Sequence, residues 1–117
     1  MNEKISVKIV VFEHPEPQKW GKYCGYCAET NDFQGRGKTI EEVVSMIRKH
    51  LLFDLRHRFQ YDTLQNLGWE ITNDSIKAPS FTPEEAVKLT EVSYEVKLKY
   101  YQIIEVHVRI PKQKSPD

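Results

Sequence analysis

The sequence has no long hydrophobic run and no signal-like start, and these absences exclude whole classes of protein. No apolar stretch within the 117 residues approaches the roughly 18–20 residues that a membrane-spanning helix needs. The first six residues also lack the hydrophobic segment of a secretion signal. We therefore expect a cytoplasmic protein that makes no contact with a membrane.

The chain also lacks an excess of charge of either sign. It contains 17 basic and 17 acidic residues, with 10 basic and 8 acidic groups in residues 1–60 and 7 and 9 in residues 61–117. A free-standing nucleic-acid-binding domain should show a strongly basic face or a net positive charge. A net charge of zero does little for solubility and favours a chain that works within an assembly.

Cysteine is scarce, and the two cysteines, Cys24 and Cys27, have the spacing C-x-x-C. Thiol–disulfide enzymes place such a pair at a helix N-terminus, which lowers the thiol pKa. Here the neighbouring residues predict a strand, in which the two side chains point to opposite faces because the side-chain period is two. They could then neither form a disulfide nor share a zinc ion. We expect a buried Cys24 and an incidental Cys27, with a redox or zinc role as the alternative.

Three strands are predicted in the first third of the chain. Residues 5–11 alternate between apolar and other side chains, which is typical of a strand with one buried face. Two prolines then end the strand and open a surface loop over residues 15–21. A second strand is expected over residues 22–29, a turn at Asn31-Asp32, and a short third strand over residues 33–37.

The clearest helix follows, from Ile40 to about Phe59. Thr39 and Glu42 have the spacing of a capping box, in which the Thr hydroxyl accepts from the N–H three residues on and the Glu reaches back to the Thr N–H. Apolar residues then recur at intervals of three and four, which predicts one buried stripe. The stripe consists of Ile40, Val43, Val44, Ile47, Leu51 and Leu55.

Shorter elements are predicted beyond this helix. Gly68 is expected to stop the preceding helical segment. Residues 69–72 predict a fourth strand, with a turn at Asn73-Asp74 and a returning strand over residues 75–78. These signals predict a small hairpin between the main helix and the last part of the chain.

A second helix and a long strand are predicted at the C-terminal end. Thr82, the proline after it and Glu85 form a second capping box, which opens a short helix to about Glu91. Residues 94–110 then alternate over seventeen positions, whereas an ordinary strand has about 5–6 residues. Such a strand either bends to serve two sheet edges or reaches a second chain. Residues 111–117 are expected to form a flexible polar tail.

The sequence gives little support for an enzyme active site. A phosphate-binding loop ending at Gly37 would need a glycine where the chain has Asp32. A metal-dependent nuclease needs three or four converging carboxylates, and no spacing links the candidates. Those candidates are Glu13, Glu29, Asp32 and Asp54. We therefore expect no catalytic residues, no cofactor and no metal ion.

Basic residues on the predicted main helix offer an alternative function. They are Arg48, Lys49, Arg56 and Arg58. Together with nearby aromatic residues such as Phe59 and Tyr61, they could form an RNA-binding face, although a solvated helix surface explains them as well. An RNA-binding face would require salt-dependent affinity that falls when Arg56 and Arg58 are replaced by alanine.

The order of these elements resembles the HicB antitoxin family over about residues 4–72. In this family a Gln-Gly-Asp-Thr-x-Glu-Glu-Ala-like run opens the helix that follows three strands. The corresponding places are occupied here by Gly37, Thr39, Glu41, Glu42 and Val43, with Lys38 where an aspartate is common. The run Gly68-Trp69-Glu70-Ile71 after the helix adds to the resemblance.

The resemblance implies an α+β fold of the β-β-β-α-β partial RNase H-like type, in which one main helix packs on an antiparallel sheet. It also implies a non-catalytic antitoxin that oligomerises and occludes a small HicA-type toxin, which cleaves mRNA. Residues 82–117 offer neither a second helix nor a basic excess, so operator DNA binding is not expected.

These observations predict a single domain over residues 1–117. Residues 4–72 form its core, and residues 82–110 add the C-terminal helix and strand. We expect a homo-oligomer, dimer or tetramer, because a strand over residues 94–110 would leave an exposed apolar edge. Tyr100, Tyr101 and Ile103 are the expected partner contacts. The alternative is a solitary RNA-binding, regulatory or oligomerisation domain that uses the basic helix face.

Overall fold

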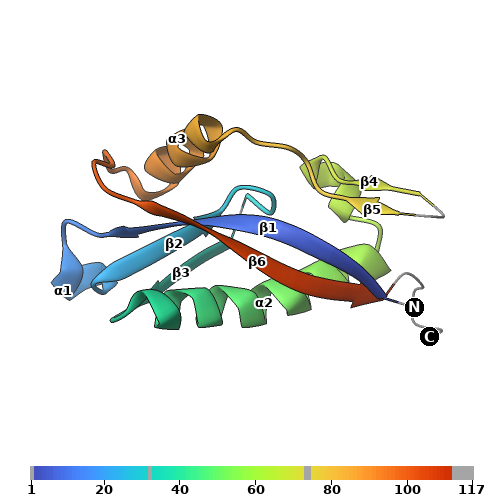
Figure 1. Cartoon of the computed structure of the whole chain (residues 1–117), viewed down its shortest axis with the longest axis horizontal. Coiled ribbons are helices and arrows are strands. Elements are labelled where there is room, and N and C mark those ends of the chain that lie inside the picture. The colour runs from blue at the N-terminus through green and yellow to red at the C-terminus, as the bar shows by residue number, and fades with distance from the viewer. Residues whose placement is uncertain (1, 32, 73–74, 112–117) are drawn as a thin grey trace.

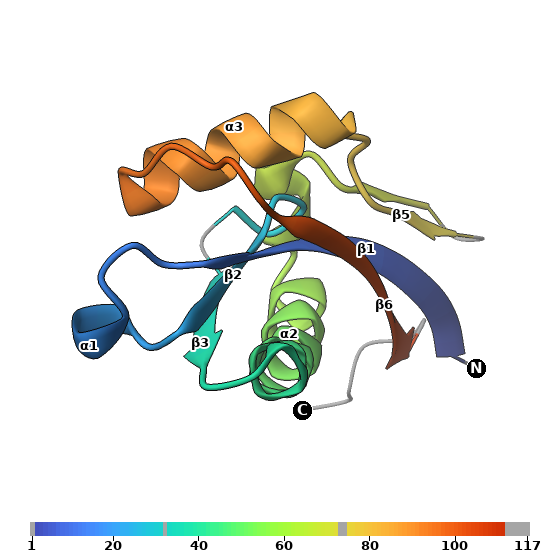
Figure 2. The ribbon, with the colours of Figure 1, turned by 60° about the vertical axis from the view of Figure 1, so that its left-hand side comes forward.

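The fold is α+β, with an antiparallel sheet of four strands between two helices (Figures 1 and 2). The computed structural model describes residues 2–31, 33–72 and 75–111. The elements are β1 (Asn2–Glu13), α1 (Pro17–Trp20), β2 (Tyr23–Cys27), β3 (Phe33–Gly37), α2 (Ile40–Gln60), the 3₁₀ helix η1 (Leu64–Leu67), β4 (Glu70–Ile71), β5 (Ile76–Lys77), α3 (Pro83–Tyr94) and β6 (Gln102–Pro111). The sheet has the order β3-β2-β1-β6. In the described part of the chain, no helix has the length and apolar composition needed to cross a bilayer.

The main hydrophobic core lies between the sheet and α2. Alternate residues of β1 and β6 meet the apolar stripe of α2, as the periodicity of the sequence predicts. Each large side chain buried there contributes about 1.5–3 kcal/mol. The fully buried members include Val7 and Ile9 from β1, Val43, Ile47, Leu51 and Leu55 from α2, and Ile110 from β6.

A second, smaller core lies on the opposite face of the sheet, beneath α3. Val10 and Tyr26 from the sheet are buried there together with Ala86 from α3. The capping box predicted at the start of α3 is complete, because Thr82 and Glu85 exchange both expected hydrogen bonds, at 3.1 and 2.8 Å. The sheet is therefore covered on both faces over β1 and β2, but α3 does not extend over the N-terminal half of β1 (Figure 1).

The start of α2 differs in one detail from the prediction. Glu42 N–H donates to Thr39 Oγ1 at 3.1 Å, as expected. The Glu42 carboxylate, however, accepts from Lys38 N–H at 2.7 Å instead of from Thr39 N–H. The cap is still effective, because a carboxylate near an N-terminus interacts favourably with the helix dipole. The helix ends at Gln60, one residue beyond the predicted end.

Two predictions between the larger elements need correction. The predicted surface loop over residues 15–21 contains the one-turn helix α1, with a proline at its first position. The predicted hairpin around Asn73-Asp74 does form strands, but β4 and β5 pair only with each other as a separate ribbon. Its turn residues lie outside the described residues. The fourth strand of the sheet is therefore β6, and not the strand that directly follows the main helix.

The predicted strand over residues 94–110 is wrong in its first half. Tyr94 ends α3, about one turn after the predicted end, and Glu95 has the left-handed conformation (φ 55°) that terminates the helix. Tyr94 is held there because its hydroxyl donates to Gly25 O at 2.8 Å and Gly35 O at 3.2 Å. Only β6 is a strand, and it pairs with β1 of the same chain.

The strand over residues 94–110 does not form as predicted, but β6 still lies at an edge of the sheet in the described part of the chain. Self-association itself stays a prediction. The tail expected over residues 111–117 lies, beyond the end of β6, outside the described residues.

Candidate functional site: a groove along the free edge of β6

The backbone of β6 presents unpaired hydrogen-bonding groups at the edge of the sheet. Lys8 N–H donates to Glu29 Oε2 at 3.0 Å and His14 N–H donates to Lys22 O at 3.0 Å, so the even-numbered residues of β1 face β2. The odd-numbered residues of β1 therefore face β6, and their partners are the even-numbered residues of β6. The backbone groups that point away from the sheet belong to Ile103, Glu105, His107 and Arg109. In the described part of the chain, no strand pairs with this edge.

Three hollows lie side by side between this edge and α2. The first, of about 210 Å³, is lined by the end of β1, by Tyr23 and Ile40, and by residues 100–102 where β6 begins. The second, of about 400 Å³, extends from Ile40 to Arg48 and includes Ile104. The third, of about 460 Å³, begins at Arg48 and follows the second half of β6. Because Ile40 and Arg48 are each shared by two hollows, we treat the three as one continuous groove, called the edge groove below.

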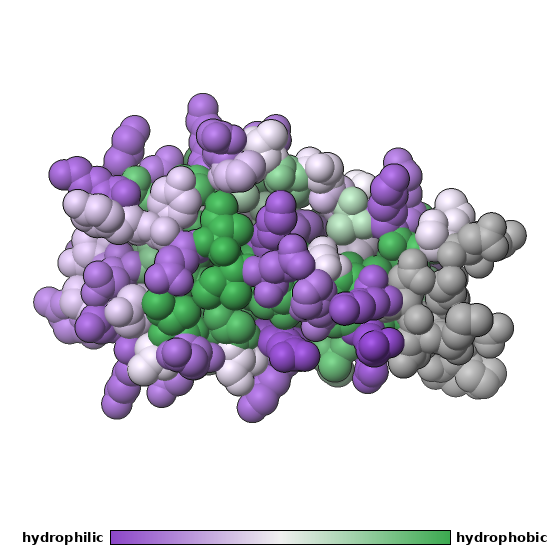
Figure 3. All heavy atoms as spheres, viewed as in Figure 1, coloured by the Kyte–Doolittle hydropathy of each residue, from purple (hydrophilic) through white to green (hydrophobic). Residues whose placement is uncertain are grey.

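The first half of the edge groove combines aromatic and aliphatic residues with Glu13 and Glu41. Its lining includes Tyr100 and Tyr101 at the start of β6, and Ile40, Val44 and Ile104 further along. Tyr100 is 86% exposed and Tyr101 is 44% exposed. Figure 3 shows hydrophobic surface gathered over the first half of β6 and the adjoining part of α2. Exposed aromatic and aliphatic side chains beside an open strand edge are typical of a protein-binding surface.

The second half of the edge groove is basic. Most of the residues that line the third hollow are basic or histidine, and no carboxylate lines it. They are Lys4 from β1, Arg48 and Arg56 from α2, and His107 and Arg109 from β6. In Figure 3 most of the surface over this half of β6 is hydrophilic. The nearest acid on β6, Glu105, lies 3.2 Å from His107 Nε2, while Ser6 Oγ lies 2.7 Å from His107 Nδ1.

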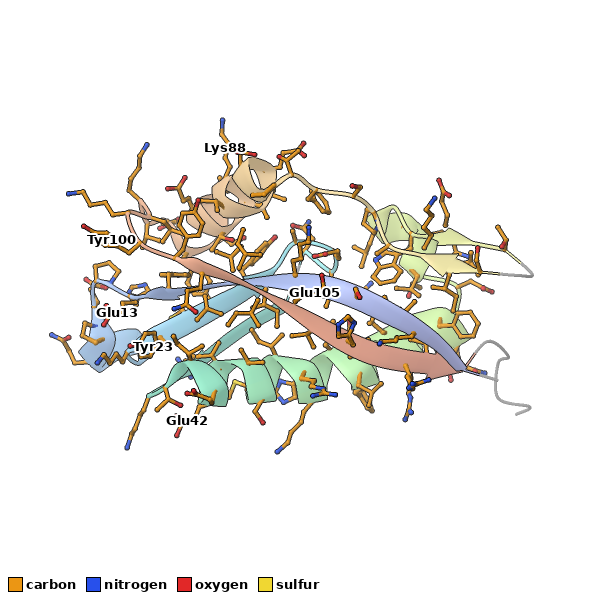
Figure 4. The ribbon with its side chains drawn as sticks, in the orientation of Figure 1. Glu13, Tyr23, Glu42, Lys88, Tyr100 and Glu105 are labelled. Carbon is orange, nitrogen blue, oxygen red and sulfur yellow. The ribbon has the colours of Figure 1, made fainter. Side chains whose placement is uncertain are left out.

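The predicted partner-binding residues divide between two places. Tyr100 and Tyr101 line the first hollow together with Tyr23. Figure 4 shows Tyr100, Glu13 and Tyr23 at the same end of the sheet. The side chain of Ile103 instead packs in the core beneath α3, so only its backbone reaches the free edge. The structure thus brings the two tyrosines to one site. Ile103 lies within β6, where its side chain points to the sheet face covered by α3.

The four basic residues of the RNA alternative do not form one surface. Arg48 and Arg56 line the edge groove, whereas Lys49 is exposed outside it. Arg58 Nε donates to Asp54 Oδ2 at 3.0 Å on the partly buried side of α2. Of the aromatic residues, Phe59 is buried in the main core and Tyr61 lies against His57. Arg58 and the two aromatic residues are therefore separated from Arg48 and Arg56, which share one hollow.

The two cysteines lie on opposite faces of β2, as predicted, and neither is bonded to the other. Cys27 belongs to the main core under α2. Burial raises its pKa to about 12, and the nearby Glu29 carboxylate adds to the effect. Burial also raises the pKa of Cys24, although the positive charge of Arg36 opposes that shift. Both thiols are therefore protonated at neutral pH, unlike the thiolates of redox enzymes.

We expect neither cysteine to react with a water-soluble disulfide reagent such as Ellman's reagent while the protein is folded. The reason is that the reactive thiolate is scarce and both side chains are fully buried. Absorbance should show two thiols per chain only after denaturant is added. A fast reaction of one thiol in the native state would mean that β2 opens readily at that position.

The carboxylates considered for a nuclease are dispersed. Glu13 is exposed at one end of the sheet, and Asp54 pairs with Arg58. Glu29 is buried, which raises its pKa, and it accepts a hydrogen bond from the Lys8 backbone. Asp32 lies outside the described residues. Where the chain is described, no group of three or more potential metal ligands gathers.

Sequence reasoning missed most of the basic half of the edge groove. Lys4, His107 and Arg109 come together with α2 because β1 and β6 pair although they are about a hundred residues apart. The sequence does show charged residues alternating along β6. This alternation predicts that they lie on one face of the strand, but it does not identify the residues of other elements that lie beside them.

Comparison with known proteins gives no further guide: no family model, no curated protein and no solved structure matches this chain.

Proposed function

We propose that this chain is a non-catalytic binding domain that takes up an extended segment of a partner protein along the edge groove. The observation that carries the proposal is a continuous groove beside an unpaired strand edge. An unpaired edge is a template for an added strand, whose main chain supplies affinity while side-chain pockets supply specificity. The edge groove offers both parts of this mode of binding.

Tyr100 and Tyr101 serve as the anchors in this proposal. They lie at the start of β6, where a partner strand would enter the first hollow. At protein interfaces, tyrosine is enriched among the residues whose replacement by alanine costs about 2 kcal/mol or more of binding free energy. Tyr100 has the larger exposed fraction and therefore the larger area to bury on binding.

The more specific proposal is an antitoxin role similar to that of HicB proteins, with a small mRNA-cleaving toxin as the partner. Its support is the sequence resemblance around Gly37–Val43 together with a surface suited to holding another protein. Inhibition would be steric, because a toxin bound along β6 would have its own surface covered. Expression of the partner alone should then arrest growth, and co-expression of this chain should relieve the arrest.

The binding mode can be tested by amide hydrogen exchange on the chain purified with its partner from the native host. The amides of Glu105, His107 and Arg109 should become protected in the complex, because they point away from β1 in the free chain. The neighbouring amides of Val106 and Val108 already bond to β1 and should change little. No stable partner, or protection confined to α3 or to the outer face of α2, would contradict the proposal.

A further inference from the structure

We infer that the basic end of the edge groove selects an acidic strand, so that the partner segment carries carboxylates where it passes Arg48 and Arg56. This inference rests on the proposed function and names the chemistry of the partner. Four of the seven residues around the third hollow are Lys or Arg, and a fifth is His107. The second half of the edge groove therefore favours an anionic occupant.

The cations have few acidic neighbours of their own. In the described part of the chain, no carboxylate forms an ion pair with Arg48, Arg56 or Arg109. The acids at the groove are Glu13, which lines the first hollow, Glu41, which lines the second, and Glu105, which is already beside His107. A partner carboxylate would thus gain a charge-assisted contact without displacing an existing ion pair.

The spacing along α2 specifies a pattern for the partner. Arg48 and Arg56 are eight residues apart, which is about 12 Å along a helix. A strand covers about 13 Å in four residues, and its alternate side chains share one face. Leu52 lies midway between the two arginines and also lines the third hollow. The matching sequence is acidic-x-apolar-x-acidic, with all three specified side chains facing α2.

Two other occupants fit the groove less well. RNA would meet Glu41 and Glu105 along the same path, and it would leave the free backbone groups of β6 without a matching ladder. A second copy of this chain, added antiparallel at the β6 edge, would bring its own α2 beside the first. The cations at positions 48 and 56 of both copies would then face each other, and like charges in such proximity are unfavourable.

A pair of synthetic peptides tests the inference on the full chain. The acidic probe contains Glu-Thr-Leu-Thr-Glu between threonines, and the matched basic probe has lysine in place of both glutamates. Amide spectra of the labelled chain should show shifts at Glu105, His107 and Arg109, with the acidic probe binding about tenfold or more tightly than the basic one. The double variant Arg48→Glu, Arg56→Glu should reverse this preference.

Lys49→Glu is the matched control, because it reverses a charge on the same helix but outside the edge groove. It should leave the preference for the acidic probe unchanged, within about twofold. Its amide spectrum, like that of the double variant, reports directly whether the fold is intact. Loss of the preference in Lys49→Glu would overturn the inference in favour of a general attraction between net charges.

The remaining outcomes separate this inference from the proposed function. Equal binding of both probes at the β6 edge would overturn the acidic preference and leave strand addition in place. No shift at the edge with millimolar probe would count against both. Tighter binding of a ten-nucleotide uridine oligomer at the same amides, or a dimer of the chain that protects them, would overturn the acidic protein partner in favour of that occupant.

Discussion

Replacing Ile47 by alanine is expected to lower the free energy of unfolding by about 2–5 kcal/mol, the range of isoleucine-to-alanine substitutions at buried core positions. Ile47 is fully buried in the centre of α2. Its side chain lies between α2 and the sheet directly over Gly25 of β2 and Gly35 of β3, which pair with each other. A cavity at this position is flanked by the helix and by two strands, so it closes only partly.

The two glycines explain why the helix approaches the sheet so closely. A Cβ at Gly35 would lie 2.5 Å from Ile47 Cγ1, and one at Gly25 would lie 2.6 Å from Ile47 Cδ1. Gly35→Ala alone should therefore cost about 1–3 kcal/mol through overpacking. In the Ile47→Ala background the same substitution should cost less or become favourable, because the added methyl occupies space that the isoleucine has left.

Urea denaturation of the two single variants and the double variant measures this coupling. Met46→Ala is the control, because Met46 neighbours Ile47 in sequence but is exposed on the outer side of α2. Its free energy of unfolding should change by less than about 0.5 kcal/mol. If the changes in unfolding free energy caused by Ile47→Ala and Gly35→Ala are simply additive, Ile47 does not pack against Gly35 as the structure describes.

Local signals in the sequence were sufficient for much of the fold. The stripe of α2, the complete cap at Thr82 and the opposite orientations of Cys24 and Cys27 all follow from residue spacing within one element. These features depend on periodicity and short-range hydrogen bonds, which a single sequence records directly. The three strands before α2 were predictable for the same reason.

Contacts between residues far apart in the sequence could not be predicted. The alternation that begins at Tyr94 has the period of a strand, yet the hydroxyl of Tyr94 reaches the carbonyl groups of Gly25 and Gly35 and holds the residue in α3. Similarly, Trp69 is buried and its indole N–H donates to Glu29 O at 2.9 Å. Tertiary packing decides such positions, and local propensity does not reveal it.

The candidate site was predictable only in part, for a related reason. The sequence predicts Tyr100 and Tyr101 as contacts because they are aromatic side chains at the edge of a predicted strand, and both are exposed. The groove between α2 and β6 required the register of β1 with β6, because that register determines which residues of β6 face outward. A shift of one residue would exchange the buried and exposed sets, so the site could not be derived before the register was known.

Replacing Glu105 by proline is expected to weaken partner binding about 100-fold or more while leaving the fold intact. Glu105 N–H points away from β1, so proline removes a donor from the free edge and places a ring where a partner strand would lie. The lost hydrogen bond and the steric block each oppose strand addition. Retention of the co-purifying partner by the immobilised chain measures the effect, and circular dichroism checks the fold.

Two further variants make this result specific. Glu105→Ala removes the same carboxylate and its contact with His107 but keeps the N–H, so binding should change by no more than about threefold. Val106→Pro places proline one residue further, where the N–H bonds to β1, and should destabilise the whole sheet. If Glu105→Pro and Glu105→Ala retain the partner equally well, the free edge is not where the partner binds. If Val106→Pro lowers stability less than Glu105→Pro does, the assigned direction of the β6 amides is reversed. The even-numbered residues of β6 would then carry the free backbone groups of the edge.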